Sequence, residues 1–141
     1  MQTYYQCYWN KTSEENIRIL RMFGESEEAV VPEMIAGRAV VEAGDYCFAV
    51  SEHLPAEYGC TVCIYGTEEK TWQEIPADGA GWNTRLVELS GARLKKLTLP
   101  DNMRKVGNYA FYNCTALEML VTGKYLEEIG SDAFMNCKKF H

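Results

Sequence analysis

The sequence is poor in the groups that most often carry chemistry. It has only two histidines, and one of them, His141, is the last residue. His53 alone would have to act as a base, and no spacing nominates a serine or cysteine as its partner. A glycine-rich phosphate-binding loop is also missing. We therefore expect neither catalytic residues nor a cofactor.

Long apolar segments and a basic surface are missing as well. No stretch is long and apolar enough to span a membrane, and the start of the chain lacks the basic residues and apolar run of a signal peptide. If Met1 is the native start we expect a cytoplasmic protein; if the start was trimmed, a cell-surface or secreted protein is the alternative. The net charge of -6 argues against a nucleic-acid partner. We also expect no membrane partner.

The six cysteines are scattered and contain only one CxxC pair, Cys60 and Cys63. For a cytosolic chain this predicts reduced thiols and not a disulfide framework. With Cys47 and His53 the pair could complete four zinc ligands, and a redox role is the other reading. Against both, a second CxxC is missing, and Cys60 and Cys63 on one strand would point to opposite faces. A zinc or redox protein built on Cys60 and Cys63 is therefore kept as an alternative.

An internal repeat is the strongest signal in the sequence. Two copies of one pattern, over residues 94–114 and 117–137, are offset by 23 residues. The matched positions include Leu94 with Leu117, Gly107 with Gly130, Phe111 with Phe134 and Cys114 with Cys137; Phe140 matches Leu117 at the same offset. This period lies in the leucine-rich range of roughly 20–29 residues. A third copy lies upstream, where residues 30–33 match 98–101 and residues 44–48 match 107–111.

The repeat pattern resembles that of the BspA-like leucine-rich repeat proteins of bacteria. The resemblance covers residues 29–50 and 94–140 and is weak over residues 51–93. It implies a solenoid fold and a role in adhesion or partner binding, often outside the cell. It implies nothing about which partner is bound.

The fold expected from these patterns is an α/β repeat, a leucine-rich repeat solenoid with short parallel strands and an N-terminal β-hairpin cap. Residues 94–99 and 117–122 are predicted to form adjacent parallel strands, because leucines alternate with other residues there. The returning arcs should bury four apolar side chains, namely Val106, Phe111, Ile129 and Phe134. One repeat cannot bury its apolar face alone, so stacking on neighbours should supply the stability.

Two regions frame the repeats. Residues 1–28 are predicted to be the cap, a hairpin built from residues 3–9 and 17–23 across a polar turn. Residues 29–141 are predicted to be the solenoid, interrupted by an irregular insertion at 51–93. Within the insertion, residues 61–65 and 85–89 are strand candidates and residues 67–75 a short helix with Thr67 as its N-cap.

The predicted function is a non-catalytic protein-interaction or scaffold module with an unknown protein partner. The outward strand positions Lys96, Thr98, Met119 and Val121 are the predicted contact residues on the concave face. Trp72 and Trp82, in the irregular insertion, are further candidates for contact. A third reading is that the chain is the N-terminal fragment of a longer repeat protein with no separate activity.

Self-association is a further expectation. Phe140 matches the start of a new strand, and no polar capping segment follows it. The last repeat should therefore leave an unpaired strand edge, over residues 119–122, which can pair with another chain. We expect a homodimer through this C-terminal edge.

Overall fold

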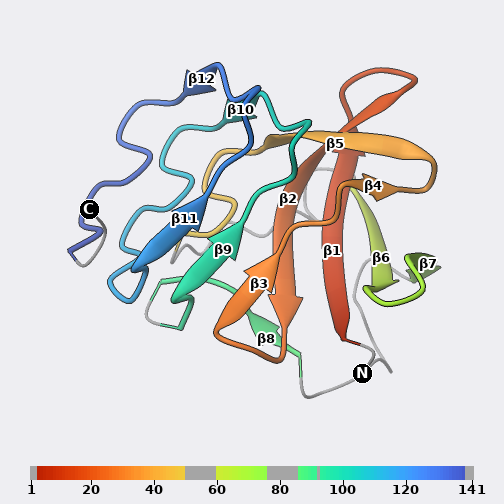
Figure 1. Ribbon diagram of the computed structural model, residues 1–141, viewed down its shortest axis with the longest axis horizontal. Helices are drawn as coiled ribbons and strands as arrows, with labels where there is room; N and C mark the ends of the chain where they lie inside the picture. The colour runs from red at the N-terminus through yellow and green to blue at the C-terminus, as the bar shows by residue number, and fades with distance from the viewer. Residues whose placement is uncertain (1–2, 50–59, 76–85, 92, 139–141) are drawn as a thin grey trace.

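A computed structural model describes residues 3–49, 60–75, 86–91 and 93–138, and these residues form strands and turns without a helix (Figure 1). The expected α/β class is therefore wrong for the described residues. The physical reason lies in the returning arcs. Tyr109 and Asn113 have positive φ angles of 57° and 60°, and Asp132 and Asn136, one repeat later, have 54° and 62°. A right-handed helix cannot continue through such residues.

The strands form two sheets. The larger has the order β12-β10-β5-β2-β1-β6-β7, with β4 paired to β5 and β8 to β2; the smaller has the order β11-β9-β3. The strands are β1 (Tyr4–Lys11), β2 (Asn16–Gly24), β3 (Glu28–Val30), β4 (Met34–Ile35), β5 (Arg38–Ala43), β6 (Thr61–Gly66), β7 (Thr71–Ile75), β8 (Val87–Glu88), β9 (Lys96–Thr98), β10 (Lys105–Val106), β11 (Met119–Val121) and β12 (Glu128–Ile129).

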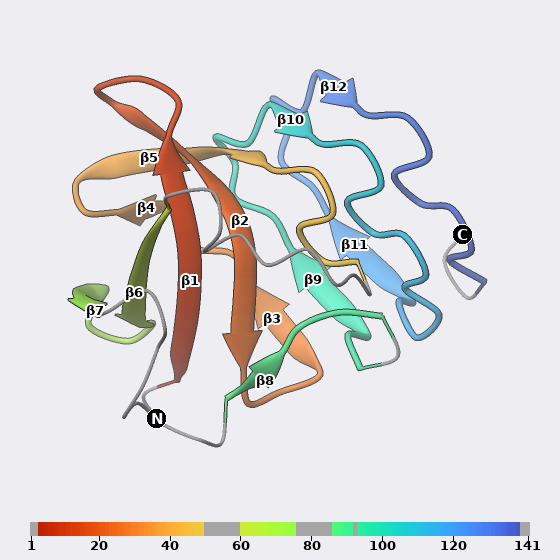
Figure 2. The same ribbon diagram turned by 180° about the vertical axis from the view of Figure 1, so that it is seen from behind.

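The first two strands are a long antiparallel hairpin at one end of the stacked repeats (Figure 2). Alternate side chains of each strand are buried, among them Cys7, Ile17 and Ile19. β2 then pairs in parallel with β5, so the hairpin lies directly against the first repeat. Ile17 and its register partner Val40 are both fully buried at this junction.

The repeats stack in register, each on the one before it. β9 pairs in parallel with β11, and β10 in parallel with β12, and both registers follow the 23-residue offset. The Phe48, Phe111 and Phe134 rings form one stack with centroid separations of 5.3 and 5.1 Å. Side chains bridge the same gaps: the Asp45 carboxylate accepts from the Asn108 N–H, and the Asn108 side-chain oxygen accepts from the Ser131 N–H, both at 2.8 Å.

Burial along the stack separates the four predicted core residues into two groups. Val106 and Phe111 are fully buried. Ile129 is 54% exposed and Phe134 is only partly buried, so the prediction that both are core residues is wrong for Ile129 and half right for Phe134. They belong to the last repeat of the described chain, and no described repeat covers their outer side. Phe140 lies outside the described residues.

The described parts of the insertion join the hairpin's sheet. β6 pairs antiparallel with β1, and β7 pairs antiparallel with β6. The helix predicted over residues 67–75 is therefore wrong: residues 67–70 form a turn and the remainder is β7. Lys70 has a φ of 56°, which a helix does not allow. His53, Trp82 and Arg85 lie outside the described residues.

Candidate functional site

The candidate site is the outer face of the three-stranded sheet β3-β9-β11, which Figure 1 shows side by side. The middle residue of each strand points inward: Ala29 and Leu97 are buried and Leu120 is partly buried. Because side chains alternate along a strand, the residues on either side of these point outward. Outward neighbours on adjacent strands lie in two rows, Glu28 with Lys96 and Met119, and Val30 with Thr98 and Val121.

The structure brings the four predicted contact residues together on this face. Lys96 is the register partner of Met119, and Thr98 is the register partner of Val121. Met119 is 51% exposed and Val121 is 40% exposed, so both apolar side chains face solvent.

Two residues of the same face were missed by the sequence reasoning. Val30, 53% exposed, and Glu28 continue the rows onto β3. The signal was present, because residues 30–33 match 98–101 and Val30 is therefore the equivalent of Thr98. Together Val30, Met119 and Val121 place three exposed apolar side chains on one small sheet.

Charged side chains border the apolar positions. Lys95 and Glu27 form an ion pair of 3.1 Å at the rim next to β9. The hydrogen bond from Lys95 to the Glu27 carboxylate raises the lysine pKa, and the nearby charge of Glu27 adds to that shift. The pair is exposed, so it contributes little stability; it places one positive and one negative charge at this rim.

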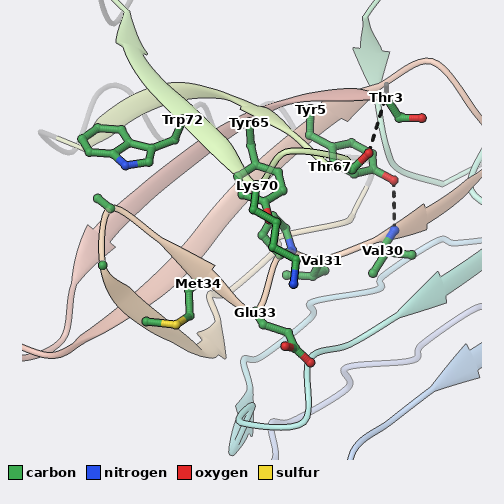
Figure 3. Close-up of a pocket in the computed structure, with 13 residues that line it drawn as sticks. Thr3, Tyr5, Val30, Val31, Glu33, Met34, Tyr65, Thr67, Lys70 and Trp72 are labelled. Carbon is green, nitrogen blue, oxygen red and sulfur yellow. Dashed lines mark hydrogen bonds between the residues drawn. The ribbon is translucent and has the colours of Figure 1, made fainter. Parts of the chain in front are cut away.

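A pocket of about 820 Å³ adjoins this face (Figure 3). Val30 belongs to both, and Figure 3 shows Tyr65 and Lys70 between Val30 on one side and Trp72 on the other. The pocket is lined by Thr3, Tyr5, Val30, Val31, Pro32, Glu33, Met34, Ala36, Gly37, Tyr65, Thr67, Lys70 and Trp72. It thus lies where the segment from β3 to β4 meets β1, β6 and β7, of which β6 and β7 are far from that segment in the sequence.

Hydrogen bonds hold the pocket walls, and its exposed lining residues include both apolar and charged ones: Met34 and Trp72, with Glu33 and Lys70. The Tyr5 hydroxyl accepts a hydrogen bond of 3.1 Å from the Val30 N–H, and the Thr67 N–H donates to the Thr3 carbonyl at 2.9 Å. Burial raises the pKa values of Tyr5 and Tyr65, so both stay neutral phenols. Met34 and Trp72 are 52% and 45% exposed. The predicted contact residue Trp72 therefore stands beside this pocket.

The cysteines of the CxxC pair do not gather metal ligands in the part of the chain that is described. There, no group of three or more histidine, cysteine, aspartate or glutamate side chains is placed to hold a metal ion. Cys63 is buried opposite Cys7 on the neighbouring strand, and Cys60 is half-buried before β6 begins. Burial raises the pKa of Cys47 to about 12, so this thiol stays protonated in the structure described.

The arrangement of short parallel strands stacked at a constant offset is that of a leucine-rich repeat protein. Residues 89–141 match the family described as BspA type leucine rich repeat region (6 copies). The C-terminal part of the chain thus matches BspA-type leucine-rich repeats, the family that the sequence pattern resembles. A comparison with curated proteins found no match. Within the described residues, a helix with the length and apolar character needed to cross a membrane is absent.

Two solved structures are similar in fold. A T. pallidum leucine rich repeat protein is 22% identical, with a TM-score of 0.60 over 94% of this chain and 44% of that protein. A leucine rich cell surface protein from Faecalibacterium prausnitzii is 18% identical, with a TM-score of 0.59 over 94% of this chain and 27% of that protein. The chain therefore spans less than half the length of either.

Proposed function

We propose that the chain is a non-catalytic protein-interaction module that binds a protein partner on the outer face of β3-β9-β11. The observation that carries the proposal is the exposure of Val30, Met119 and Val121 on this one face. Clustered exposed apolar side chains with a polar rim are typical of interaction surfaces. The membership of residues 89–141 in a leucine-rich repeat family supports the same conclusion.

The pocket beyond Val30 extends this surface. Its exposed aromatic and thioether side chains, Trp72 and Met34, supply the kind of contact that dominates binding energy at protein interfaces. A partner that covers the sheet face and inserts one apolar side chain beside Trp72 would use both parts of the site. Lys96 and Thr98 would then supply polar contacts at the centre of the sheet.

The proposal also covers where in the cell the protein is found. Display at the cell surface is the reading we favour, because the Faecalibacterium prausnitzii structure of similar fold is described as a cell surface protein. The cytoplasm is the alternative. Protease treatment of intact source cells, followed by immunoblotting of the full-length gene product, distinguishes them, because only a surface protein is digested.

The binding proposal is tested with a matched pair of double variants. A partner is first identified by crosslinking in the source cell, and its affinity for the purified chain is measured by calorimetry. Met119→Ser with Val121→Thr removes apolar surface from the face. Val87→Thr with Ile129→Thr removes exposed apolar surface elsewhere and is the control. We expect the first pair to weaken binding at least tenfold, equivalent to about 1.4 kcal/mol, and the control to leave it unchanged.

The opposite pattern of affinities would place the binding site elsewhere on the molecule. Equal affinity for the Met119→Ser/Val121→Thr variant and the unmodified chain would show that the partner does not cover this sheet. Trp72→Ala then reports on the pocket alone. If neither variant changes the affinity, the proposed surface is wrong in both of its parts.

A further inference from the structure

Cys7 and Cys63 lie directly opposite each other on adjacent antiparallel strands. They are register partners in the β1-β6 ladder, and both side chains are fully buried. Opposed residues in such a ladder point to the same side of the sheet, with Cα atoms about 4.5–5.5 Å apart. A disulfide needs a Cα separation of about 4.4–6.8 Å. The backbone therefore already holds these two thiols where a disulfide could form.

Two thiols along the repeat stack, the buried Cys114 and the half-buried Cys137, are held differently. The Cys114 thiol donates to the Phe48 carbonyl at 3.2 Å, and the Cys137 thiol donates to the Phe111 carbonyl at 3.0 Å. These two thiols thus satisfy backbone acceptors between neighbouring repeats, and burial raises the pKa of Cys114 to about 12.

Cys7 and Cys63 contact each other instead. The hydrogen bond from the Cys7 thiol lowers the pKa of Cys63, and the same contact, with burial, raises the pKa of Cys7. The Trp9 indole N–H also lowers the pKa of Cys63. That N–H is buried and has no hydrogen-bond partner among the described residues, so it is available to donate to the Cys63 sulfur when that thiol ionises. Of the two thiols, Cys63 is thus the one that ionises more readily.

We propose that Cys7 and Cys63 are a cross-strand dithiol that converts to a disulfide by exchange with a small-molecule disulfide such as oxidised glutathione. During folding, before both thiols are buried, the Cys63 thiolate attacks one sulfur of that disulfide, forms a mixed disulfide and releases one thiolate. The Cys7 thiol then loses its proton and attacks the Cys63 sulfur, releasing the second thiolate. Two protein thiols are oxidised, and one disulfide is reduced to two thiols.

The consequence is a covalent link between the hairpin and the insertion. The bond would fasten β1 to β6 and close the chain segment between them into a loop. A loop of this kind stabilises the folded state mainly by restricting the unfolded chain. The pair differs from the CxxC reading of the sequence, because Cys60 takes no part in it.

The test uses the full chain and does not depend on solvent access to buried thiols. The reduced protein is unfolded in denaturant, refolded in a glutathione redox buffer, quenched with iodoacetamide and mapped by non-reducing peptide mass spectrometry. We expect one linked peptide pair, containing Cys7 and Cys63, and an intact mass lower than that of the equally alkylated reduced chain by the two carbamidomethyl groups that Cys7 and Cys63 do not take up. Cys60→Ser is the matched control and should give the same link.

A second measurement separates this link from incidental oxidation. The oxidised chain should melt several degrees above the reduced chain, and the Cys7→Ser/Cys63→Ser variant should show no difference between the two conditions. If this variant does not fold, the shift in the unmodified chain and in Cys60→Ser, together with the peptide map, carries the test. A link between Cys60 and Cys63, a link between Cys7 and Cys47, or free thiols at both positions after refolding would each overturn the proposal.

Discussion

The two ends of the repeat stack carry similar residues in different surroundings. At the N-terminal end, the hairpin strand β2 lies against β5, and Ile17, Ile19 and Val40 are fully buried. At the C-terminal end of the described chain, β12 has β10 on one side only, and Ile129 is 54% exposed. Val106 and Ile129 are register partners of the same repeat position, yet one is fully buried and the other is not.

The difference shows that a repeat does not contain its own core. Each repeat supplies half of an apolar interface, and the residue becomes buried only when a neighbour supplies the other half. The Phe111 ring lies between two rings, whereas the Phe134 ring has a described ring on one side. The contribution of each repeat to the free energy of unfolding is therefore expected to fall from the N-terminal end, which the hairpin covers, to the C-terminal end of the described chain, called the open end below. Substitutions at equivalent positions measure that gradient.

The largest effect is expected where a ring is removed from the middle of the stack. Phe111→Ala should destabilise the protein by about 3–5 kcal/mol, because the ring is fully buried and its removal leaves a cavity. Phe134→Ala should cost about 1–2 kcal/mol, since that side chain is only partly buried. Urea unfolding of both variants gives the two values. Equal losses would contradict the gradient.

A steric substitution between repeats should have the next largest effect. A Cβ at Gly107 would lie 2.6 Å from the Asp45 backbone nitrogen, so Gly107→Ala forces the two repeats apart. We expect a loss of about 1–3 kcal/mol, as for other overpacked positions. Gly130→Ala meets Asn108 in the same way but displaces only the last described repeat, so its loss should be smaller. Thermal melting of the two variants side by side is the measurement, and a larger shift for Gly130→Ala would refute the explanation.

The repeat period made several of these positions predictable. The 23-residue offset placed Gly107 and Gly130, and Phe111 and Phe134, at equivalent positions, and the alternation around Leu97 identified the outward residues of β9 and β11. These are local properties of a repeated pattern. They survive in the structure because each repeat packs in the same way on the one before it.

What the sequence could not reveal depends on neighbours in space. The exposure of Ile129 follows from the lack of a described covering repeat, which its own repeat pattern does not encode. Residues 71–75 form β7 because β6 offers them a strand edge, although their sequence also suits a helix. The pocket between Val30 and Trp72 needs the hairpin sheet to meet the segment after β3. Contacts of this kind are long-range and have no signal in periodicity.

A smaller effect is expected from the side chains that bridge the repeats. The Asn108 side chain accepts a hydrogen bond from the Ser131 N–H at the gap nearest the open end. Asn108→Ala should cost about 0.5–1.5 kcal/mol through the loss of this bond. Ser131→Ala is the matched control, because it keeps the backbone N–H and should change stability less. Amide hydrogen exchange at Ser131 should become faster in Asn108→Ala; an unchanged rate would show that the bond contributes nothing in solution.

The smallest effect on stability, and a separate effect on association, is expected at the open end itself. Ile129→Thr should change the unfolding free energy by no more than about 0.5 kcal/mol, because the side chain is already exposed. Val106→Thr, at the equivalent buried position, should cost several times more, since it buries a hydroxyl group. If the C-terminal edge joins two copies of the chain, Ile129→Thr should weaken that dimer by removing apolar contact. Val87→Thr should not, because Val87 is also exposed, at 44%, but lies on β8. Light scattering over a range of concentrations measures both variants.

A dimer that persists unchanged in Ile129→Thr would place the contact elsewhere, and a monomer at every concentration would show that the exposed edge does not pair with a second copy. An unpaired strand edge alone is enough to make pairing possible, so the monomer result would point to the flanking charges, among them Lys124 and Lys138, as the groups that keep two such edges apart.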